Sequence, residues 1–302
     1  MMGAPRRSAR VLVLLASIVL VPSPARGGAP TTLRVLFSED AFTTVNRNDT
    51  LASAKAWIET VGRSRKIDLI VEVNSYASLE ELRKSVRDRS ADLYVVNSTH
   101  YLDLGTDQSR LEPQFLPQGG GAPHREYLLL MRGDRRVPLA GLRGKNIIFL
   151  ATGGVNLGRM WFDRTLREAG LGSLDDFCPA ARSAPKPSSA ILPVFFNQAD
   201  ACVADAEGFR VMEELNPQLG RELEATLISP PLLETLICVH REFTDQREEL
   251  LAGLAGLHEE PAGRQILLVF KIDRLVPFNE QALDTVRELR AADCRVLEVT
   301  SR

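Results

Sequence analysis

Short apolar runs alternate with helix-like segments along most of the chain, and this alternation restricts its fold more than any other feature. Strand-like runs occupy Leu33–Phe37, Asp68–Val73 and Ala91–Val96, and a helical pattern follows each of the first two. Ser78 and Glu81 stand at the capping-box spacing S-x-x-E, which marks the start of the second helix. Strands that alternate with helices predict an α/β fold in which helices cover mainly parallel sheets.

The second half of the chain repeats this organisation after a loop rich in Pro and Gly. Two of its strand-like runs, Glu126–Arg132 and Leu233–His240, are alike in length and apolarity, so we interpret them as crossings between two lobes. The chain length also suggests two domains, at about 150 residues each. We expect residues 31–131 and 236–302 to form a discontinuous first lobe and residues 132–235 to form the second.

The N-terminal segment has the order of a secretory signal. The first ten positions hold three arginines and no acidic residue, and the apolar run Val11–Val21 follows. This run is shorter than the roughly 20 apolar residues of a membrane-spanning helix, and Ser23 and Ala25 are small enough for signal peptidase. We expect export to the periplasm and cleavage after Ala25, with an uncleaved anchor as the alternative. There is no cysteine near this site, so a lipid-anchored N-terminus is not expected.

Charge and cysteine spacing exclude several classes of protein. Loss of residues 1–25 removes three arginines and moves the formal charge from -2 to about -5. An acidic chain without clustered basic residues is not expected to bind nucleic acid. The absence of a CxxC pair argues against a zinc or dithiol redox site. We interpret Cys202 and Cys238 as buried thiols in apolar runs, while disulfides remain open among the four cysteines Cys178, Cys202, Cys238 and Cys294.

Motifs of covalent or metal-assisted catalysis are missing from the sequence. There is no GxSxG elbow, no HExxH and no GxxxxGK[ST]. His100 lies in a polar loop after a strand, but no evident Ser or Cys nucleophile accompanies it to form a triad. We therefore expect no enzymatic activity, no cofactor and no metal.

Polar loops follow four of the predicted strands, and in open α/β sheets ligands bind beyond the carboxyl ends of the strands. The glycine-rich turn at residues 152–156 leads into a helix, so its backbone N–H groups suit an anion. The alternative is an ordinary turn that needs glycine for its dihedral angles. These loops supply the candidate ligand-binding residues Ser38, Tyr76, Asn97, Ser98, Thr99, Tyr101, Thr152, Gly153, Gly154 and Asn156.

Two aromatic and two acidic side chains leave alternatives open. Tyr76 and Tyr101 either line a pocket or cap the edge of the sheet. Glu207 follows the strand-like run ADACVAD, and Glu234 lies at the start of the return crossing LETLICVH. We count both acids among the candidate ligand-binding residues, where each would pair with a ligand cation, and the alternative for each is an ordinary solvated carboxylate.

The order of these segments resembles the phosphate, phosphite and phosphonate type of ABC-transporter substrate-binding protein, the PhnD-like family. The resemblance runs from Leu33 to about Phe278. It rests on LRVLF, VEVNSYASLEELRKSVRDRSADLYVV, LAGLRGKNIIFLATGG, ADACVADAEGF and SPPLLETLICVHREF. It implies the type 2 periplasmic-binding-protein fold, in which two α/β lobes joined by two hinge crossings enclose the ligand.

The resemblance also implies roles for particular residues. Tyr76 matches a ligand-binding Tyr after the second strand, and Asn97, Ser98 and Thr99 fall in the loop after the third. Glu207 and Glu234 lie close to the acidic positions of members that take aminoalkylphosphonates.

The chain departs from the family pattern at two places. Residues 155–158 read VNLG where the family has Ser-Thr-Ser-Gly, so hydroxyl donors for phosphonate oxygens are lost. Lys186 and Pro187 occupy the region where a His is expected. Both departures argue against phosphonate itself and favour a different anion, bound through Thr152, Asn156 and backbone N–H groups.

These observations predict a periplasmic solute-binding protein that captures a small anionic, phosphate- or phosphonate-like ligand for an ABC permease. It would work as a monomer, by hinge closure about the two crossings. The alternative is a periplasmic sensing module for a membrane signalling protein, which the absent anchoring cysteine and the altered anion loop favour. Enzymatic action would require a reactive group that the sequence does not reveal.

Overall fold

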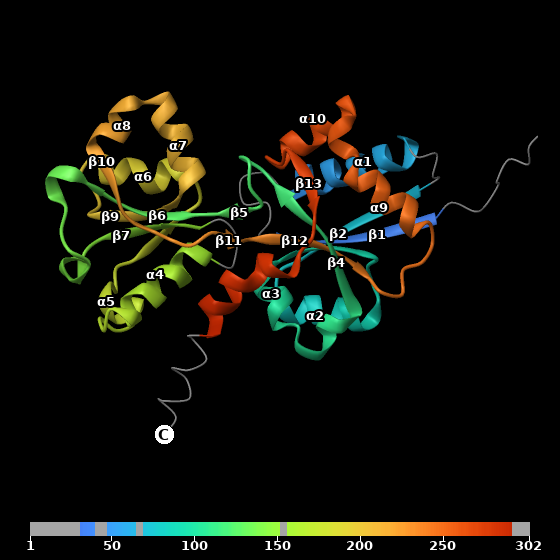
Figure 1. The fold of residues 1–302 in the computed structure, drawn as a ribbon, viewed down its shortest axis with the longest axis horizontal. Coiled ribbons are helices and arrows are strands. Elements are labelled where there is room, and N and C mark those ends of the chain that lie inside the picture. Colours follow the sequence, from blue (N-terminus) through green and yellow to red (C-terminus); the bar gives the residue numbers. More distant parts are fainter. Residues whose placement is uncertain (1–30, 40–46, 65–68, 152–155, 292–302) are drawn as a thin grey trace, which may run out of the picture.

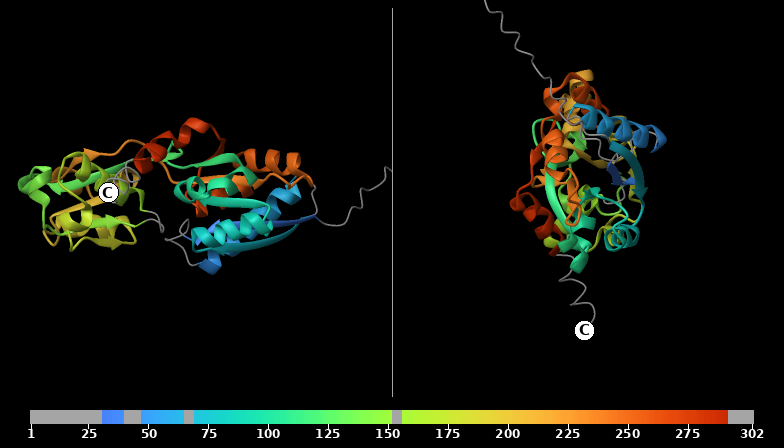
Figure 2. Two further views of the ribbon diagram at one scale, coloured as in Figure 1. Left: turned by 90° about the horizontal axis from the view of Figure 1, so that it is seen from below. Right: turned by 90° about the vertical axis from the view of Figure 1, so that its right-hand side faces the viewer.

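The computed structural model describes residues 31–39, 47–64, 69–151 and 156–291. These residues form two α/β lobes, one at each end of an elongated molecule (Figures 1 and 2). Each lobe has its own sheet, with six strands in the first and five in the second. A small antiparallel ribbon of β5 (His124–Arg125) and β11 (Leu232–Leu233) lies between the two sheets.

The first sheet is parallel on one side and antiparallel on the other. Its strand order is β13-β4-β12-β3-β1-β2, and β1 pairs in parallel with both β2 and β3. The remaining pairs, which involve β12, β4 and β13, are antiparallel. The strands are β1 (Thr31–Ser38), β2 (Leu69–Tyr76), β3 (Leu93–Asn97), β4 (Leu111–Gln118), β12 (Thr235–His240) and β13 (Arg274–Pro277).

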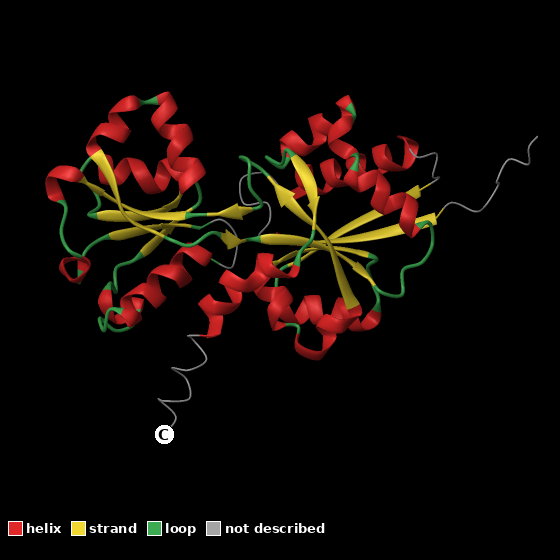
Figure 3. Cartoon of the chain, viewed as in Figure 1, coloured by secondary structure: helices red, strands yellow, loops and turns green. Residues whose placement is uncertain are grey.

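Helices cover both faces of the first sheet (Figure 3). One face carries α1 (Arg47–Ser64), α9 (Arg247–Ala255) and α10 (Pro261–Val269). The other carries α2 (Leu79–Asp88), α3 (Ser98–Asp103) and a helix of residues 284–291. Ser78 caps α2 as predicted, since its side chain accepts from the Glu81 backbone N–H at 3.2 Å. Short 3-10 turns lie at Gly105–Arg110, Leu257–Glu259 and Glu280–Leu283.

The second sheet has the order β10-β6-β9-β7-β8. Its strands are β6 (Tyr127–Arg132), β7 (Ile147–Leu150), β8 (Arg182–Ala184), β9 (Ala201–Asp205) and β10 (Leu223–Ile228). Its helices are α4 (Leu157–Glu168), α5 (Leu174–Phe177), α6 (Pro187–Phe195), α7 (Ala206–Leu215) and α8 (Pro217–Glu222), with 3-10 turns at Gly133–Arg135 and Leu139–Leu142.

Alternate residues of β7 face opposite sides of the second sheet, as the two-residue period of a strand requires. Ile147 and Phe149 join the core under α4 and α5, whereas Ile148 and Leu150 join the core under α6, α7 and α8. The strand is therefore apolar throughout because helices bury both of its faces.

Two expectations from the sequence need correction. The sheets are mixed rather than mainly parallel, because β7 pairs in parallel with β8 and β9 while β6 pairs antiparallel with β9 and β10. Neither Glu126–Arg132 nor Leu233–His240 is itself a crossing, since β6 belongs to the second sheet and β12 belongs to the first. Apolarity shows that a strand is buried, but it does not show which sheet supplies its neighbours. We propose that the lobes divide at β5 and β11 instead of at residues 131 and 235.

Three of the four cysteines lie in the described part of the chain, whereas the predicted N-terminal signal does not. Cys178, Cys202 and Cys238 are buried free thiols, and burial raises the pKa of Cys202 and of Cys238. Cys294 and residues 1–25 lie outside the described residues. Within the described ranges, no helix has the length and apolarity needed to span a membrane.

Candidate ligand site at the crossing of the lobes

Ser38 and Tyr76 end two adjacent parallel strands and are register partners. Both side chains are buried at the carboxyl edge of the first sheet. The Ser38 Oγ atom is buried and makes no hydrogen bond within the part of the chain that the structure describes. The Tyr76 ring lies 5.9 Å from the His100 ring between centroids, so it brings α3 to the same edge. This edge therefore presents a hydroxyl and aromatic groups together.

Asn97 organises the loop between β3 and α3. Its Oδ1 atom accepts from the His100 backbone N–H at 2.8 Å and from Thr99 Oγ1 at 3.0 Å. Its Nδ2 atom lies 3.1 Å from His100 Nδ1. Both ends of the amide are thus engaged within the loop, so Asn97 shapes the start of α3 as an N-cap residue.

Ser98 and Tyr101 face the interior of the protein. Ser98 Oγ donates to the Leu233 carbonyl at 2.6 Å, and its backbone N–H donates to the Glu234 carbonyl at 2.8 Å. These two bonds fasten α3 to the chain between β11 and β12. Tyr101 packs in the core, where burial raises its pKa to about 12.

Asn156 has the corresponding structural role in the second lobe. Its Oδ1 atom accepts from the Arg159 backbone N–H at 2.9 Å, and its Nδ2 atom donates to the Leu150 carbonyl at 2.9 Å. The side chain thereby ties the end of β7 to the start of α4. Thr152, Gly153 and Gly154, which precede it, lie outside the described residues.

The first turn of α7 begins where β9 ends. Asp205 is buried and caps this helix, accepting from the Gly208 backbone N–H at 2.7 Å. Glu207 is more exposed, and Arg210 donates to both of its carboxylate oxygens at 2.6 and 2.9 Å. The hydrogen bonds from Arg210 lower the pKa of Glu207. A Cβ on Gly120 would lie 3.3 Å from Glu207 Cδ, so Glu207 reaches the turn that leads into β5.

Arg125, Tyr127, Asp205 and Glu234 form a charged cluster at the crossing, which we call the hinge cluster. Arg125 Nε lies 2.6 Å from Glu234 Oε2, and Arg125 Nη1 lies 3.7 Å from Asp205 Oδ1. The Tyr127 hydroxyl donates to Glu234 Oε1 at 2.5 Å. Attraction to Glu234 raises the pKa of Arg125, and burial raises that of Tyr127. The cluster joins both crossing segments to the end of β9.

Sequence reasoning found Glu234 but missed Arg125, Tyr127 and Asp205. The available signal was that charged residues precede each of two matched apolar strands. Arg125 stands two positions before β6, and Glu234 stands directly before β12. The antiparallel pairing of β5 with β11 then brings these two charges together.

A model of one protein family matches residues 42–283. The family is described as the phosphonate ABC transporter, periplasmic substrate-binding protein. The chain belongs to this family. The predicted PhnD-like relationship is thereby confirmed, and membership makes the chain a periplasmic substrate-binding protein of ABC transport. No curated protein sequence matches the chain significantly.

Solved structures share the fold of this phosphonate-family protein at low sequence identity. A Xanthomonas citri protein bound to ATP has a TM-score of 0.63 at 14% identity, over 88% of this chain and 98% of its own. A binding component of a Pseudomonas aeruginosa ABC phosphonate transporter has a TM-score of 0.60 at 12% identity, over 87% of this chain and 86% of its own. Prochlorococcus marinus PhnD1, in complex with methylphosphonate, has a TM-score of 0.59 at 14% identity, over 86% of this chain and 97% of its own. The predicted type 2 periplasmic-binding-protein fold is confirmed.

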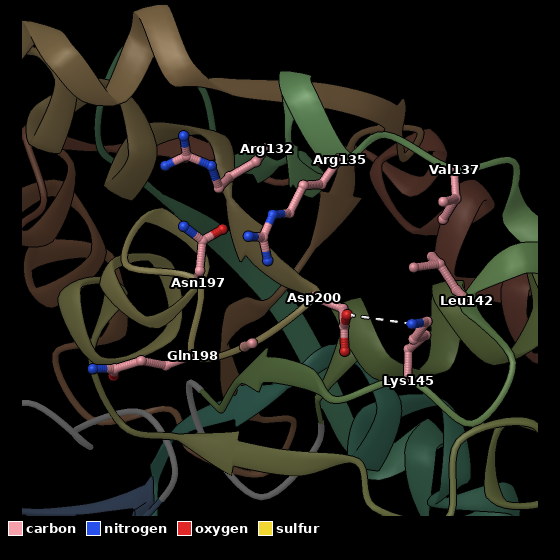
Figure 4. A pocket seen from close by; sticks show the side chains of 9 residues that line it. Arg132, Arg135, Val137, Leu142, Lys145, Asn197, Gln198 and Asp200 are labelled. Atoms are coloured by element: carbon pink, nitrogen blue, oxygen red, sulfur yellow. Dashed lines mark ion pairs between the residues drawn. The ribbon is translucent and has the colours of Figure 1, made fainter.

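A separate cavity of about 270 Å³ lies in the second lobe of this phosphonate-family protein (Figure 4). Its lining includes Lys145 and Asp200, which precede β7 and β9, and Arg132, which ends β6. Lys145 and Asp200 point toward one another, 3.7 Å apart, and Arg132 is paired with Glu222 at 2.7 Å. This cavity is at the opposite edge of the sheet from the hinge cluster, and two of its cations, Arg132 and Lys145, are held in ion pairs.

Proposed function

We propose that the protein captures a small anion of phosphate or phosphonate type between its two lobes and delivers it to an ABC permease. The observation that carries this proposal is the position of a helix start. The helices α4 and α7, of 12 and 10 residues, both begin beside the hinge cluster, but the start of α7 is already capped by the Asp205 carboxylate, whereas α4 is capped by the neutral Asn156. The partial positive charge at a helix start favours an anion.

Close packing supports the position of these two helix starts. A Cβ on Gly158, in the first turn of α4, would lie only 2.6 Å from Tyr127 Cδ1. Asp205, which caps α7, lies within 3.7 Å of Arg125. The helix α4 therefore begins against β6, and α7 begins near β5, both close to the crossing where hinge closure would cover a ligand.

On the first lobe, Ser38 and Tyr76 are the proposed contacts. Asn97 and Asn156 act by holding helix starts, because their own amides are already engaged. Ser98 and Thr99 complete the α3 start, and Thr152, Gly153 and Gly154 stay proposed backbone donors. The Tyr101 side chain hydrogen-bonds with Gln108 inside the first lobe, so we assign it a packing role rather than ligand contact.

We further propose that binding leaves the ligand chemically unchanged and that the exported protein is a monomer cleaved after Ala25. Membership of a substrate-binding family supports action without catalysis. Recovery of the ligand intact after incubation with the protein, together with the mass of the exported chain, tests these points.

A thermal-shift screen tests the proposed ligand class. Protein purified from the periplasm is heated with phosphate, phosphite, methylphosphonate, sulfonates or organic acids. A ligand at 100 times its Kd should stabilise the folded state by about 2.7 kcal/mol. Ser38→Ala and Tyr76→Ala should each reduce the shift, whereas Lys145→Ala, in the separate cavity, should leave it unchanged. Absence of a shift with every anion would refute the proposal.

A further inference from the structure

Three carboxylates lie close to the proposed ligand site, and each of them already accepts hydrogen bonds or ion pairs from other residues of the protein. Glu234 is held at both oxygens, by Arg125 Nε at 2.6 Å and by the Tyr127 hydroxyl at 2.5 Å. Arg210 occupies both oxygens of Glu207. Asp205 accepts from the start of α7 and also lies near Arg125. None of the three therefore offers a free carboxylate to a cationic group.

Arg125 occupies the space between two of these acids. Its guanidinium lies 2.6 Å from Glu234 and 3.7 Å from Asp205, which come from different lobes of the chain. A ligand ammonium would seek the same position, because opposite charges attract most strongly where water is partly excluded. An arginine remains protonated at every physiological pH, so it cannot yield this position by losing its charge.

The Arg125 side chain is also 43% exposed, so part of it is accessible from outside the cluster. A cation on the ligand would meet this positive charge at short range, and like charges repel. Because Arg125 already occupies the position between Glu234 and Asp205, an ammonium group would gain no ion pair there to offset this repulsion. A ligand without a cationic group loses nothing by that occupancy.

We propose that Arg125 determines specificity by excluding ligands that carry an ammonium group, so the ligand is a phosphate or phosphonate-type anion with a neutral or anionic substituent. This inference rests on the proposed function, because it names the ligand class of the same site. Arg125 fills the position between Glu234 and Asp205 that a ligand cation would otherwise occupy.

Calorimetric titration of the periplasmic protein with methylphosphonate and with 2-aminoethylphosphonate tests this inference. These two probes share the phosphonate group and differ by the ammonium group. The wild-type protein should bind the aminoethyl compound at least tenfold more weakly. Arg125→Met removes the charge at similar length and should reduce or reverse this ratio, because Glu234 and Asp205 then become available.

Two further variants separate charge from folding. Arg125→Lys keeps the positive charge and should keep the discrimination. Glu234→Gln added to Arg125→Met removes one released carboxylate and should abolish most of the gain in aminoethyl affinity. Circular dichroism and retained methylphosphonate binding establish that each variant is folded. If Arg125→Met does not fold, the wild-type ratio and Arg125→Lys decide.

Equal or tighter binding of the aminoethyl compound by the wild-type protein overturns the inference while leaving the proposed function intact. An unchanged ratio in folded Arg125→Met overturns it as well, because discrimination would then come from elsewhere. If the wild-type protein binds neither probe nor any other phosphate-type anion, the proposed function fails and this inference fails with it.

Discussion

Tyr127 both packs in the core and hydrogen-bonds to a charged side chain. Its side chain is fully buried, its ring lies against the first turn of α4, and its hydroxyl donates to Glu234. The partner carboxylate stands 107 positions further along the chain. A hydroxyl that satisfies a half-buried carboxylate contributes more than an average hydrogen bond, because its loss leaves a charged acceptor without one of its donors.

Removal of this hydroxyl should therefore reduce stability. Tyr127→Phe keeps the ring and should lower the free energy of unfolding by about 1–3 kcal/mol. Urea denaturation measures the change. Lys145→Ala, which breaks a solvent-exposed ion pair with Asp200, serves as the control and should cost less than about 1 kcal/mol. Equal stability of Tyr127→Phe and the wild-type protein would show that Arg125 alone satisfies Glu234.

At the scale of secondary structure elements, the contact between α4 and β6 depends on Gly158, which has no side chain. A Cβ on Gly158 would lie 2.6 Å from Tyr127 Cδ1 and 3.1 Å from Val203 Cγ1. Tyr127 and Val203 are both buried in the core, so neither can move aside easily. Glycine at this position lets the helix start approach the sheet closely.

Gly158→Ala should overpack this contact and lower the free energy of unfolding by about 1–3 kcal/mol. Gly220→Ala in α8 is the matched control. The atoms nearest to its new Cβ all belong to the Glu213 side chain, whose carboxylate end is flexible and can move aside. The control should be neutral or more stable by up to about 1 kcal/mol, since alanine favours helix more than glycine does. Denaturant titration of both variants checks the difference, and equal effects would contradict a close contact at α4.

At the scale of the whole molecule, two lobes joined by short strands suit closure around a ligand. β5 and β11 pair over only two positions, and the hinge cluster lies directly beside them. Small changes in backbone dihedrals at such crossings can rotate entire lobes. The ion pair between Arg125 and Glu234 lies at this crossing, and rotation of the lobes can occur around it.

Binding of the ligand should make the molecule more compact. Small-angle X-ray scattering should record a lower radius of gyration with a saturating anion from the thermal-shift screen. Tyr76→Ala, which should bind poorly, should keep the larger radius under the same conditions. A ligand that binds by calorimetry without any change in the radius would argue against hinge closure.

The sequence by itself determined the elements and the fold class. The apolar runs that predict β1, β2, β3 and β9 form strands, and Ser78 caps the predicted helix. Local signals suffice there because strand and helix periodicity and capping act between residues close in the chain. The same reasoning led to candidate site residues such as Tyr76 and Glu234, which lie at the edge of the first sheet and at the crossing.

Only the tertiary structure decided which strands share a sheet and which charges meet. Apolarity marked Glu126–Arg132 as buried, yet pairing with β9 and β10 placed β6 in the second lobe. The contact of Arg125 with Glu234 follows from the pairing of β5 with β11, which a local pattern does not encode. Pairings between distant segments depend on the packing of whole lobes, and the hinge cluster is a product of that packing.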